Sequence, residues 1–199
     1  LLATGDAACA WHVMTGATNG LLSAYLPEAA ARAIWTERTI TAGVFAPMGK
    51  AQPEQGGFRV SGRWPFASGC QNATWLMGGA VVLTDAGPRK LASGGTEVRS
   101  CLFPADDVTI EDTWDVAGLC GTGSHHIAIA DVFVPADHSC CLSVDAPHHA
   151  GPLYRVPAFG LLAAGVAAVA VGVARAAVAA FVALAQSDGR RAASELTQR

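Results

Sequence analysis

The spacing at which hydrophobic residues recur changes twice along the 199-residue chain. Apolar residues recur at helical spacing over residues 6–36, where Asp6 is a candidate cap and Pro27 is typical of the start of a second, shorter helix. From Thr39 the period becomes two, and residues 58–64 alternate apolar and polar side chains as a half-buried strand does. The pattern therefore predicts helices followed by strands.

Short strands separated by Gly/Pro turns fill the centre of the chain. A turn at Gly56-Gly57 precedes the first clear strand, and residues 73–84 are apolar enough for a strand buried on both faces. Loops are predicted at 85–88 and 93–95, and further strands at 100–103, 108–112 and 126–134. This spacing favours a small β-barrel or sandwich over roughly 40–145.

Residues 156–174 carry no charged side chain, so by length alone they are a transmembrane candidate. The alternative is a buried helix in a bundle. Ala and Gly dominate the segment, and it lacks an aromatic belt and a polybasic flank, which favours the bundle helix. We expect that helix to end at residues 187–189 and residues 190–199 to start the next one. Helices, a β module and helices in this order predict an α+β fold with segregated layers.

Composition narrows the class of protein. The 13 Lys and Arg residues against 16 Asp and Glu residues give a net charge of −3, which leaves no basic excess for a nucleic acid. Charged residues make up 15% of the chain, against about 25% in ordinary soluble domains, which indicates apolar surface kept for partners such as other copies of the chain. The chain begins at Leu1 without a basic n-region and ends at Arg199 without a helix-stop signal, so we interpret it as the middle of a longer protein.

The cysteines and histidines predict no metal centre. None of the six cysteines forms a CxxC pair, which indicates reduced structural thiols and a cytoplasmic location. His125-His126 and His148-His149 are adjacent pairs, and neighbours on a strand point to opposite faces. The chain also lacks the GxSxG motif, so a serine hydrolase is not predicted.

Residues 57–69 carry the densest chemical signal. A strand brings Trp64 to its end, Pro65 interrupts the ladder, and the small residues Ser68 and Gly69 allow close approach to the backbone. A planar cofactor could lie against the indole, with N–H and hydroxyl donors around its polar edge. The alternative is a buried Trp before an ordinary loop.

Two further stretches could contribute backbone groups to such a site. Residues 41–50 read as a strand end that leads into a Pro/Gly turn, where main-chain groups could bind a flat heterocycle. Residues 115–126 contain three glycines that do not make the GxGxxG fingerprint, which argues against a nucleotide-phosphate loop and favours a β-turn.

Together these stretches resemble the acyl-CoA dehydrogenase superfamily, and most of all its flavin-dependent monooxygenase branch, the oxygenase components related to p-hydroxyphenylacetate hydroxylase. The residues that carry the resemblance are Ala46–Gly49, Gly62–Gly69, Asp112–Trp114, Gly118–Ser124 and Asp131–Pro135. The resemblance implies the end of an N-terminal helical domain (1–38), a central flavin-binding β-barrel or sandwich domain (39–148) and the start of a C-terminal helical bundle (149–199).

The resemblance also implies roles for individual residues. The cofactor-binding residues are Val44, Phe45, Ala46, Trp64, Phe66, Ser68 and Gly69. The main chain of the first three matches the segment that binds the flavin pyrimidine edge, Trp64 matches the aromatic beside the isoalloxazine, and Ser68, the catalytic candidate, matches a serine near flavin N5. Dehydrogenases usually have Trp-Ile-Thr/Ser-Asn where this chain has Trp-Pro-Phe-Ala-Ser-Gly, which favours the monooxygenase branch.

The implied function is the oxygenase component of a two-component monooxygenase. It would hydroxylate an aromatic or similar small substrate with reduced flavin (FMN or FAD) and O₂, beside a separate flavin reductase, as a cytoplasmic homo-oligomer (dimer or tetramer) without nucleic-acid or membrane partners. One alternative is an acyl-CoA dehydrogenase that uses FAD to introduce a 2,3-double bond, and another is a non-catalytic member. A dehydrogenase needs a carboxylate base, and residues 146–187 contain no Asp or Glu, which favours the oxygenase.

Overall fold

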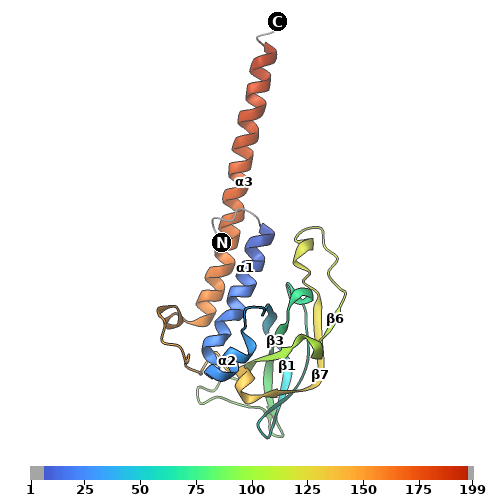
Figure 1. Cartoon of the computed structure of the whole chain (residues 1–199), viewed down its shortest axis with the longest axis vertical. Helices are drawn as coiled ribbons and strands as arrows, with labels where there is room; N and C mark the ends of the chain where they lie inside the picture. The colour runs from blue at the N-terminus through green and yellow to red at the C-terminus, as the bar shows by residue number, and fades with distance from the viewer. Residues whose placement is uncertain (1–6, 197–199) are drawn as a thin grey trace.

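Helices and a 3₁₀ turn open the chain (Figure 1). The structure is a computed structural model that describes residues 7–196, so the expected cap Asp6 lies outside the described residues. Helix α1 (Ala7–Gly20) leads through the turn η1 (Leu21–Tyr25) into α2 (Glu28–Ile34). Pro27 precedes the first residue of α2 with φ of −53°, so the predicted restart of the helix is confirmed.

Eight strands form one mixed sheet. The strands are β1 (Thr41–Glu54), β2 (Gly57–Trp64), β3 (Trp75–Thr84), β4 (Gly87–Pro88), β5 (Val98–Pro104), β6 (Thr109–Glu111), β7 (His126–Pro135) and β8 (Ser139–Cys140). Their order is β6-β7-β2-β1-β3-β5-β8, and β4 pairs with β3 as a short hairpin. Strands β1 and β3 run parallel, and the other pairs are antiparallel. The remaining 3₁₀ turns are η2 (Cys70–Asn72), η3 (Ala105–Asp107), η4 (Cys120–Thr122), η5 (Ala136–His138) and η6 (Pro152–Arg155).

Strand β1 corrects one expectation from the sequence. The predicted Pro/Gly turn within residues 41–50 is wrong, because β1 continues through Pro47 to Glu54. Its pairing with β3 shifts register between Val44 and Pro47 and again between Pro47 and Gly49. A proline lacks the N–H that a regular ladder needs, and an irregular stretch of strand tolerates that loss.

The sheet is buried on both faces. On one face, Leu76 belongs to a core cluster with Trp64 and Phe103 inside the curled sheet. On the other face, Met77 belongs to a second cluster formed with η1, α2 and the start of α3. The alternation of successive residues between the two clusters confirms the prediction that residues 73–84 are buried on both sides.

Helix α3 (Ala158–Leu196) is longer than its sequence suggested. We expected an end at residues 187–189, but the helix continues through them, and residues 190–196 belong to the same helix. A glycine inside a helix destabilises it by only about 1 kcal/mol relative to Ala, which the flanking Ala-rich turns can offset.

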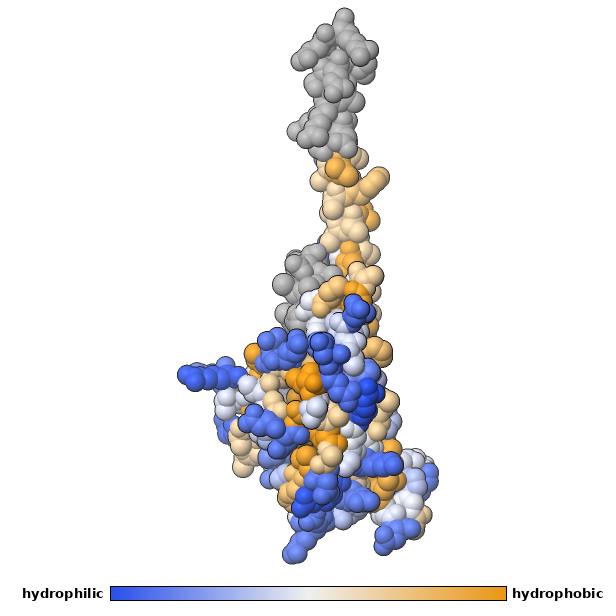
Figure 2. Space-filling model, turned by 90° about the vertical axis from the view of Figure 1, so that its right-hand side faces the viewer, coloured by the Kyte–Doolittle hydropathy of each residue, from blue (hydrophilic) through white to orange (hydrophobic). Residues whose placement is uncertain are grey.

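Most of the apolar surface of α3 is exposed in this chain. The helix packs along α1, where Met14 meets Val169, and then extends beyond the rest of the molecule (Figure 1). Apolar side chains follow its exposed length (Figure 2), including Val178 at 64% and Phe181 at 69% exposure. The stretch Ala158–Gln186 is long and apolar enough to cross a membrane by length and composition. The sequence predicts that this stretch is buried in a helical bundle, but the described residues of this chain leave most of it exposed.

Candidate functional site

The loop after β2 is held against the loop before β7. Strand β2 ends at Trp64, and Gly69 takes a left-handed conformation with φ of 79° that leads into η2. The backbone N–H of Ala67 donates to the carbonyl of His125 at 3.0 Å, and that of Gly69 donates to the carbonyl of Thr122 at 2.8 Å. Two of the three stretches that the sequence singled out are thus joined directly.

A cavity of about 190 Å³ brings in the third stretch. Its lining comes from α1, β1, the loop after β2 and α3: Trp11, Met14, Thr15, Asn19, Gly43, Phe45, Phe66, Ser68, Leu162 and Val166. A neighbouring cavity of about 380 Å³ shares Thr15 and Ser68 and adds Gly69 to the wall. The lining is mostly apolar with a few polar groups, which is the usual character of a small-molecule site.

Phe45 and Ala46 lie in the irregular part of β1. Val44 pairs with Gly78 and Pro47 with Gly79, so the register skips the two residues between them. The side chain of Val44 packs on the core, and Phe45 lines the cavity. The backbone there departs from a regular ladder, as a main-chain binding segment requires, but Ala46 does not line either of these two cavities.

Ser68 lies at the end of a row of hydrogen-bonded hydroxyl groups. Its Oγ lies 2.7 Å from Ser124 Oγ, which lies 2.7 Å from Thr122 Oγ1. Thr122 Oγ1 donates to the carbonyl of Leu119 at 2.9 Å. At the other end, the indole N–H of Trp11 donates to Ser68 Oγ at 2.9 Å. Ser68, Thr122 and Ser124 are all buried, so the row is shielded from water.

Asn19 supplies a buried acceptor without a partner. The residue is 2% exposed and lines the same cavity as Ser68. Its Nδ2 donates to the carbonyl of Thr15 at 2.8 Å, which fixes the orientation of the amide. Its Oδ1 is buried and accepts no hydrogen bond in the described part of the chain. Such a group is stabilised by a ligand that donates an N–H or O–H.

Trp64 does not occupy the position that the resemblance implies. Its side chain is 0% exposed inside the first core cluster, and its indole N–H donates to the carbonyl of Gly79 at 2.8 Å. A Cβ at Gly49, Gly62 or Gly78 would lie 2.4, 2.5 or 2.5 Å from ring atoms of Trp64, so these three glycines make room for the indole. Our expectation of an indole that faces a planar cofactor is therefore corrected to a core role.

Phe66 is the exposed aromatic of the loop. It is 65% exposed and has a left-handed φ of 64°, which is unusual for a bulky residue. Its ring meets Trp114 and His126 edge to face, at centroid distances of 6.1 and 6.3 Å. Strained backbone of this kind concentrates at functional sites. Of the aromatics that the resemblance assigned to the cofactor, Phe45 and Phe66 line the cavity.

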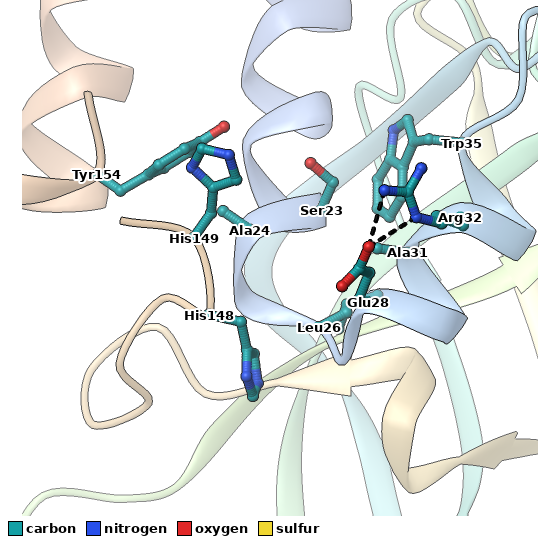
Figure 3. A pocket seen from close by; sticks show the side chains of 10 residues that line it. All are labelled: Ser23, Ala24, Leu26, Glu28, Ala31, Arg32, Trp35, His148, His149 and Tyr154. Carbon is teal, nitrogen blue, oxygen red and sulfur yellow. Dashed lines mark hydrogen bonds and ion pairs between the residues drawn. The ribbon is translucent and has the colours of Figure 1, made fainter. Parts of the chain in front are cut away.

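A separate cavity of about 460 Å³ lies between η1, α2 and the loop that contains His148 and His149 (Figure 3). Its two charged residues, Glu28 and Arg32, form an ion pair with each other at 2.7 Å. Neither of its histidines joins a metal-binding group, because the described residues contain no group of three or more His, Cys, Asp or Glu side chains that could hold a metal ion.

Five cysteines are free thiols: Cys70, Cys101, Cys120, Cys140 and Cys141. Burial raises the pKa of Cys101 and of Cys140 to about 12. Both thiols are therefore neutral at physiological pH, as expected for structural cysteines.

The sequence patterns missed several residues that complete the site. Trp11 and Asn19 are on α1, and Leu162 and Val166 are on α3. In the sequence, Trp11, Leu162 and Val166 look like ordinary apolar positions of a helix, and Asn19 looks like an ordinary polar one. Nothing in the sequence alone brings these helices to the end of β2. The hydroxyl at Ser124 lay inside the third stretch, but its link to Ser68 depends on the pairing of two loops.

Comparisons with known proteins identify relatives of this chain. The chain is 36% identical over 194 residues to the oxygenase component of FADH₂-dependent resorcinol hydroxylase from a Rhizobium species, covering 89% of this chain and 45% of that protein. It is 33% identical over 177 residues to the oxygenase subunit HsaA of a flavin-dependent monooxygenase from Mycobacterium tuberculosis, covering 84% and 42%. No family model matches the chain. The chain spans about half the length of the curated relatives that it matches.

Solved structures share the fold. The 3-HSA hydroxylase from Rhodococcus sp. RHA1 superposes with a TM-score of 0.80 at 28% identity, over 93% of this chain and 48% of that one. XiaF from a Streptomyces species, in complex with FADH₂ and glycerol, gives a TM-score of 0.75 at 30% identity, over 88% and 45%.

The mixed sheet, the helices on its outer face and the cavity between them define an acyl-CoA dehydrogenase-like protein. The chain belongs to the family of oxygenase components of flavin-dependent monooxygenases, a family of soluble enzymes.

Proposed function

We propose that the protein containing this chain is the oxygenase component of a two-component flavin-dependent monooxygenase. It takes reduced flavin, as FMN or FAD, from a separate flavin reductase and hydroxylates a small aromatic substrate with O₂. The observation that carries the proposal is the cavity where Ser68, Phe45 and Phe66 meet the unpartnered acceptor of Asn19. Its relatives include a FADH₂-dependent resorcinol hydroxylase and an indole-3-acetate monooxygenase, whose names indicate aromatic substrates.

The residues of this chain fit a flavin at its reactive edge. Phe66 offers an exposed aromatic face, Ser68 lines both cavities, and the irregular backbone at Phe45 and Ala46 offers main-chain groups. When bound, reduced flavin supplies the electrons that activate O₂ and the route by which one oxygen atom reaches the substrate. The protein orients the ring and excludes water through apolar side chains of α1 and α3.

The aromatic substrate would occupy the cavity beside the flavin. Its walls at Trp11, Met14 and Val166 suit an aromatic ring, and Asn19 Oδ1 accepts a hydrogen bond from a phenolic or indole donor. None of the described residues that line this cavity is an Asp or Glu. The lining therefore matches ring hydroxylation and offers no carboxylate base for dehydrogenation of an acyl-CoA.

The test mixes anaerobically reduced FMN or FAD with the purified protein and then with oxygenated buffer, while absorbance is followed. We expect flavin absorbance that outlasts the oxidation of free reduced flavin, and a hydroxylated product when phenols or indoles are present. With NADH as the source of electrons, turnover should require an added flavin reductase. Bleaching of bound flavin by an acyl-CoA, or failure to bind either form of flavin, would contradict the proposal.

The Asn19→Leu variant tests substrate recognition within the same cavity. Loss of one hydrogen bond to a phenolic donor should raise KM about two- to twelvefold, while affinity for reduced flavin stays near that of the wild type. The variant should discriminate less between a phenol and its O-methyl ether. Equal loss for both substrates would show that Oδ1 does not accept from the substrate.

The same proposal divides the chain into the end of a helical domain (1–38), a flavin-binding β domain (39–148) and the start of a helical bundle (149–199). It also includes a cytoplasmic location and assembly into a dimer or tetramer. The support for assembly is the exposed apolar length of α3 (Figure 2).

A further inference from the structure

The row of hydroxyl groups behind Ser68 has a fixed direction. The carbonyl of Leu119 can only accept a hydrogen bond, and the indole N–H of Trp11 can only donate one. Between these two ends stand three hydroxyl groups, and each has a single hydrogen to donate.

One arrangement alone satisfies every contact in the row. Thr122 donates to Leu119, so Ser124 must donate to Thr122, and Ser68 must then donate to Ser124. The hydrogen of Ser68 is therefore engaged with Ser124. Of the two lone pairs on its oxygen, one accepts the Trp11 N–H and the other is left to accept a hydrogen bond from a ligand in the cavity. The Trp11 N–H that reaches Ser68 Oγ at 2.9 Å is consistent with an acceptor at this position.

We propose that Thr122 and Ser124 are positioning residues that make Ser68 a hydrogen-bond acceptor, so that the site binds reduced flavin in preference to oxidised flavin. This inference rests on the proposed function. N5 of a reduced flavin carries a hydrogen and donates to an acceptor. N5 of an oxidised flavin has only a lone pair, which an oriented Ser68 oxygen would repel.

The burial of the row makes the selection effective. Thr122 is 2% exposed and Ser124 is 3% exposed, so water does not compete for their hydroxyl groups. A Ser68 released from Ser124 could rotate its hydrogen toward the cavity and donate to N5 of oxidised flavin. A protein that receives its flavin reduced and releases it oxidised gains from this distinction, because the spent cofactor leaves the site.

The experiment measures dissociation constants of oxidised and anaerobically reduced FMN and FAD for the purified protein. We expect the wild type to prefer the reduced form and Ser124→Ala to lower that preference about two- to tenfold, mainly through tighter binding of oxidised flavin. Thr122→Val should act in the same direction, and Thr122→Ser, which keeps the hydroxyl group, should restore the wild-type ratio.

Two controls separate hydroxyl orientation from a general structural effect. Oxidised 5-deazaflavin has a C–H in place of N5, so its affinity should be the same for the wild type and Ser124→Ala. Thr84→Ala removes an exposed hydroxyl that donates to the carbonyl of Gly87 in the distant β3–β4 hairpin, and its affinity ratio should equal that of the wild type.

The outcomes distinguish this inference from the proposed function. Binding of both flavins with an unchanged ratio in Ser124→Ala and Thr122→Val would overturn the orientation role and leave the proposed function standing. A wild type that binds neither flavin would overturn both. If Ser124→Ala does not fold, the contrast between Thr122→Val and Thr122→Ser decides, because Val keeps the branched shape of the side chain without its hydroxyl group and Ser keeps the hydroxyl group without the methyl group.

Discussion

Trp64 fills a space that three glycines leave open. Substitution of either the tryptophan or one of these glycines should therefore lower the stability of the fold. Trp64→Ala should lower the free energy of unfolding by about 3–5 kcal/mol, since it empties a fully buried site. Gly78→Ala should lower it by about 1–3 kcal/mol, because the added Cβ would lie 2.5 Å from the indole. Urea unfolding followed by circular dichroism measures both.

Gly118→Ala is the matched control for this contact. A Cβ at that position would meet nothing within 4 Å, so its free energy of unfolding should stay near that of the wild type. Wild-type stability in Gly78→Ala would show that the indole does not press against β3.

Phe66 combines a left-handed backbone with an exposed ring, so stability and function should separate there. Phe66→Gly relieves a φ of 64° and should leave the protein as stable as the wild type or more stable by about 1 kcal/mol. The same change removes the exposed aromatic face and should weaken flavin binding. Thermal unfolding and flavin titration measure the two effects, and unchanged flavin affinity would remove Phe66 from the site.

These two aromatics show how far single residues could be predicted. The sequence predicts residues 57–69 as the stretch with the densest chemical signal, but it could not decide which aromatic ring of this stretch lines the cavity. The outcome depends on Gly49 and Gly78, which lie on other strands and admit the indole of Trp64 into the core. A pattern along one strand contains no information about space on its neighbours.

At the scale of elements, a partly buried ion network joins the segment around the start of β5 to β8. Glu97 is 7% exposed and bonds to Arg89 at 2.6 Å and to Arg99 at 3.1 Å, and Arg99 also donates to Ser139. Hydrogen bonding from Arg89 lowers the pKa of Glu97 below its usual 4.5, against the opposing effect of burial, and Arg99 lowers it further. The network thus stabilises the fold only while Glu97 is ionised.

This network predicts a dependence of stability on pH. A carboxylate with a lowered pKa in the folded state stabilises fully above its unfolded pKa and loses that contribution as the pH falls through the folded pKa. The wild type should therefore lose stability below about pH 4.5, whereas Glu97→Gln should be less stable at pH 7 and show a flatter profile in acid. Urea unfolding between pH 3 and pH 7 measures this.

Glu28→Gln provides the control, because the Glu28–Arg32 pair is exposed at the surface of α2. An exposed pair contributes little to stability, so its profile should follow that of the wild type. Parallel profiles for Glu97→Gln and the wild type would exclude a role for the network in acid.

Element types were predictable from the sequence, and several element ends were not. The two-residue period predicted β2, the continuous apolar run of residues 73–84 predicted β3, and short strands between Gly/Pro turns predicted β5, β6 and β7. The ends of β1 and α3 were misjudged at Pro47 and at residues 187–189. Strand β1 continues through Pro47 because it pairs with β3 on both sides of that residue. Helix α3 continues because a glycine costs only about 1 kcal/mol within a long Ala-rich helix.

At the scale of the whole molecule, the exposed apolar face of α3 predicts self-association. Val178 and Phe181 lie one helical turn apart and are among the most exposed apolar side chains. We expect the protein to remain in solution without detergent as an oligomer, and Phe181→Glu to shift it toward smaller species. Size-exclusion chromatography with light scattering measures the mass.

Ile110→Glu is the control for this prediction, since it places the same charge on a 39%-exposed apolar residue in β6, away from α3. Its mass should match that of the wild type. A wild type that is monomeric at high concentration, or that is recovered only from detergent-extracted membranes, would contradict the prediction.

The fixed direction of the hydrogen bonds in the hydroxyl row also limits proton transfer along it. A proton wire must be able to pass a proton at both ends, and the row ends on the carbonyl of Leu119, which is too weak a base to take one up near neutral pH. The row therefore acts as an insulator, although it reaches from the buried Ser68 to a loop whose Leu119 is 50% exposed. Any solvent isotope effect on turnover should consequently survive in Thr122→Val, because protons exchange between the cavity and bulk water by another path.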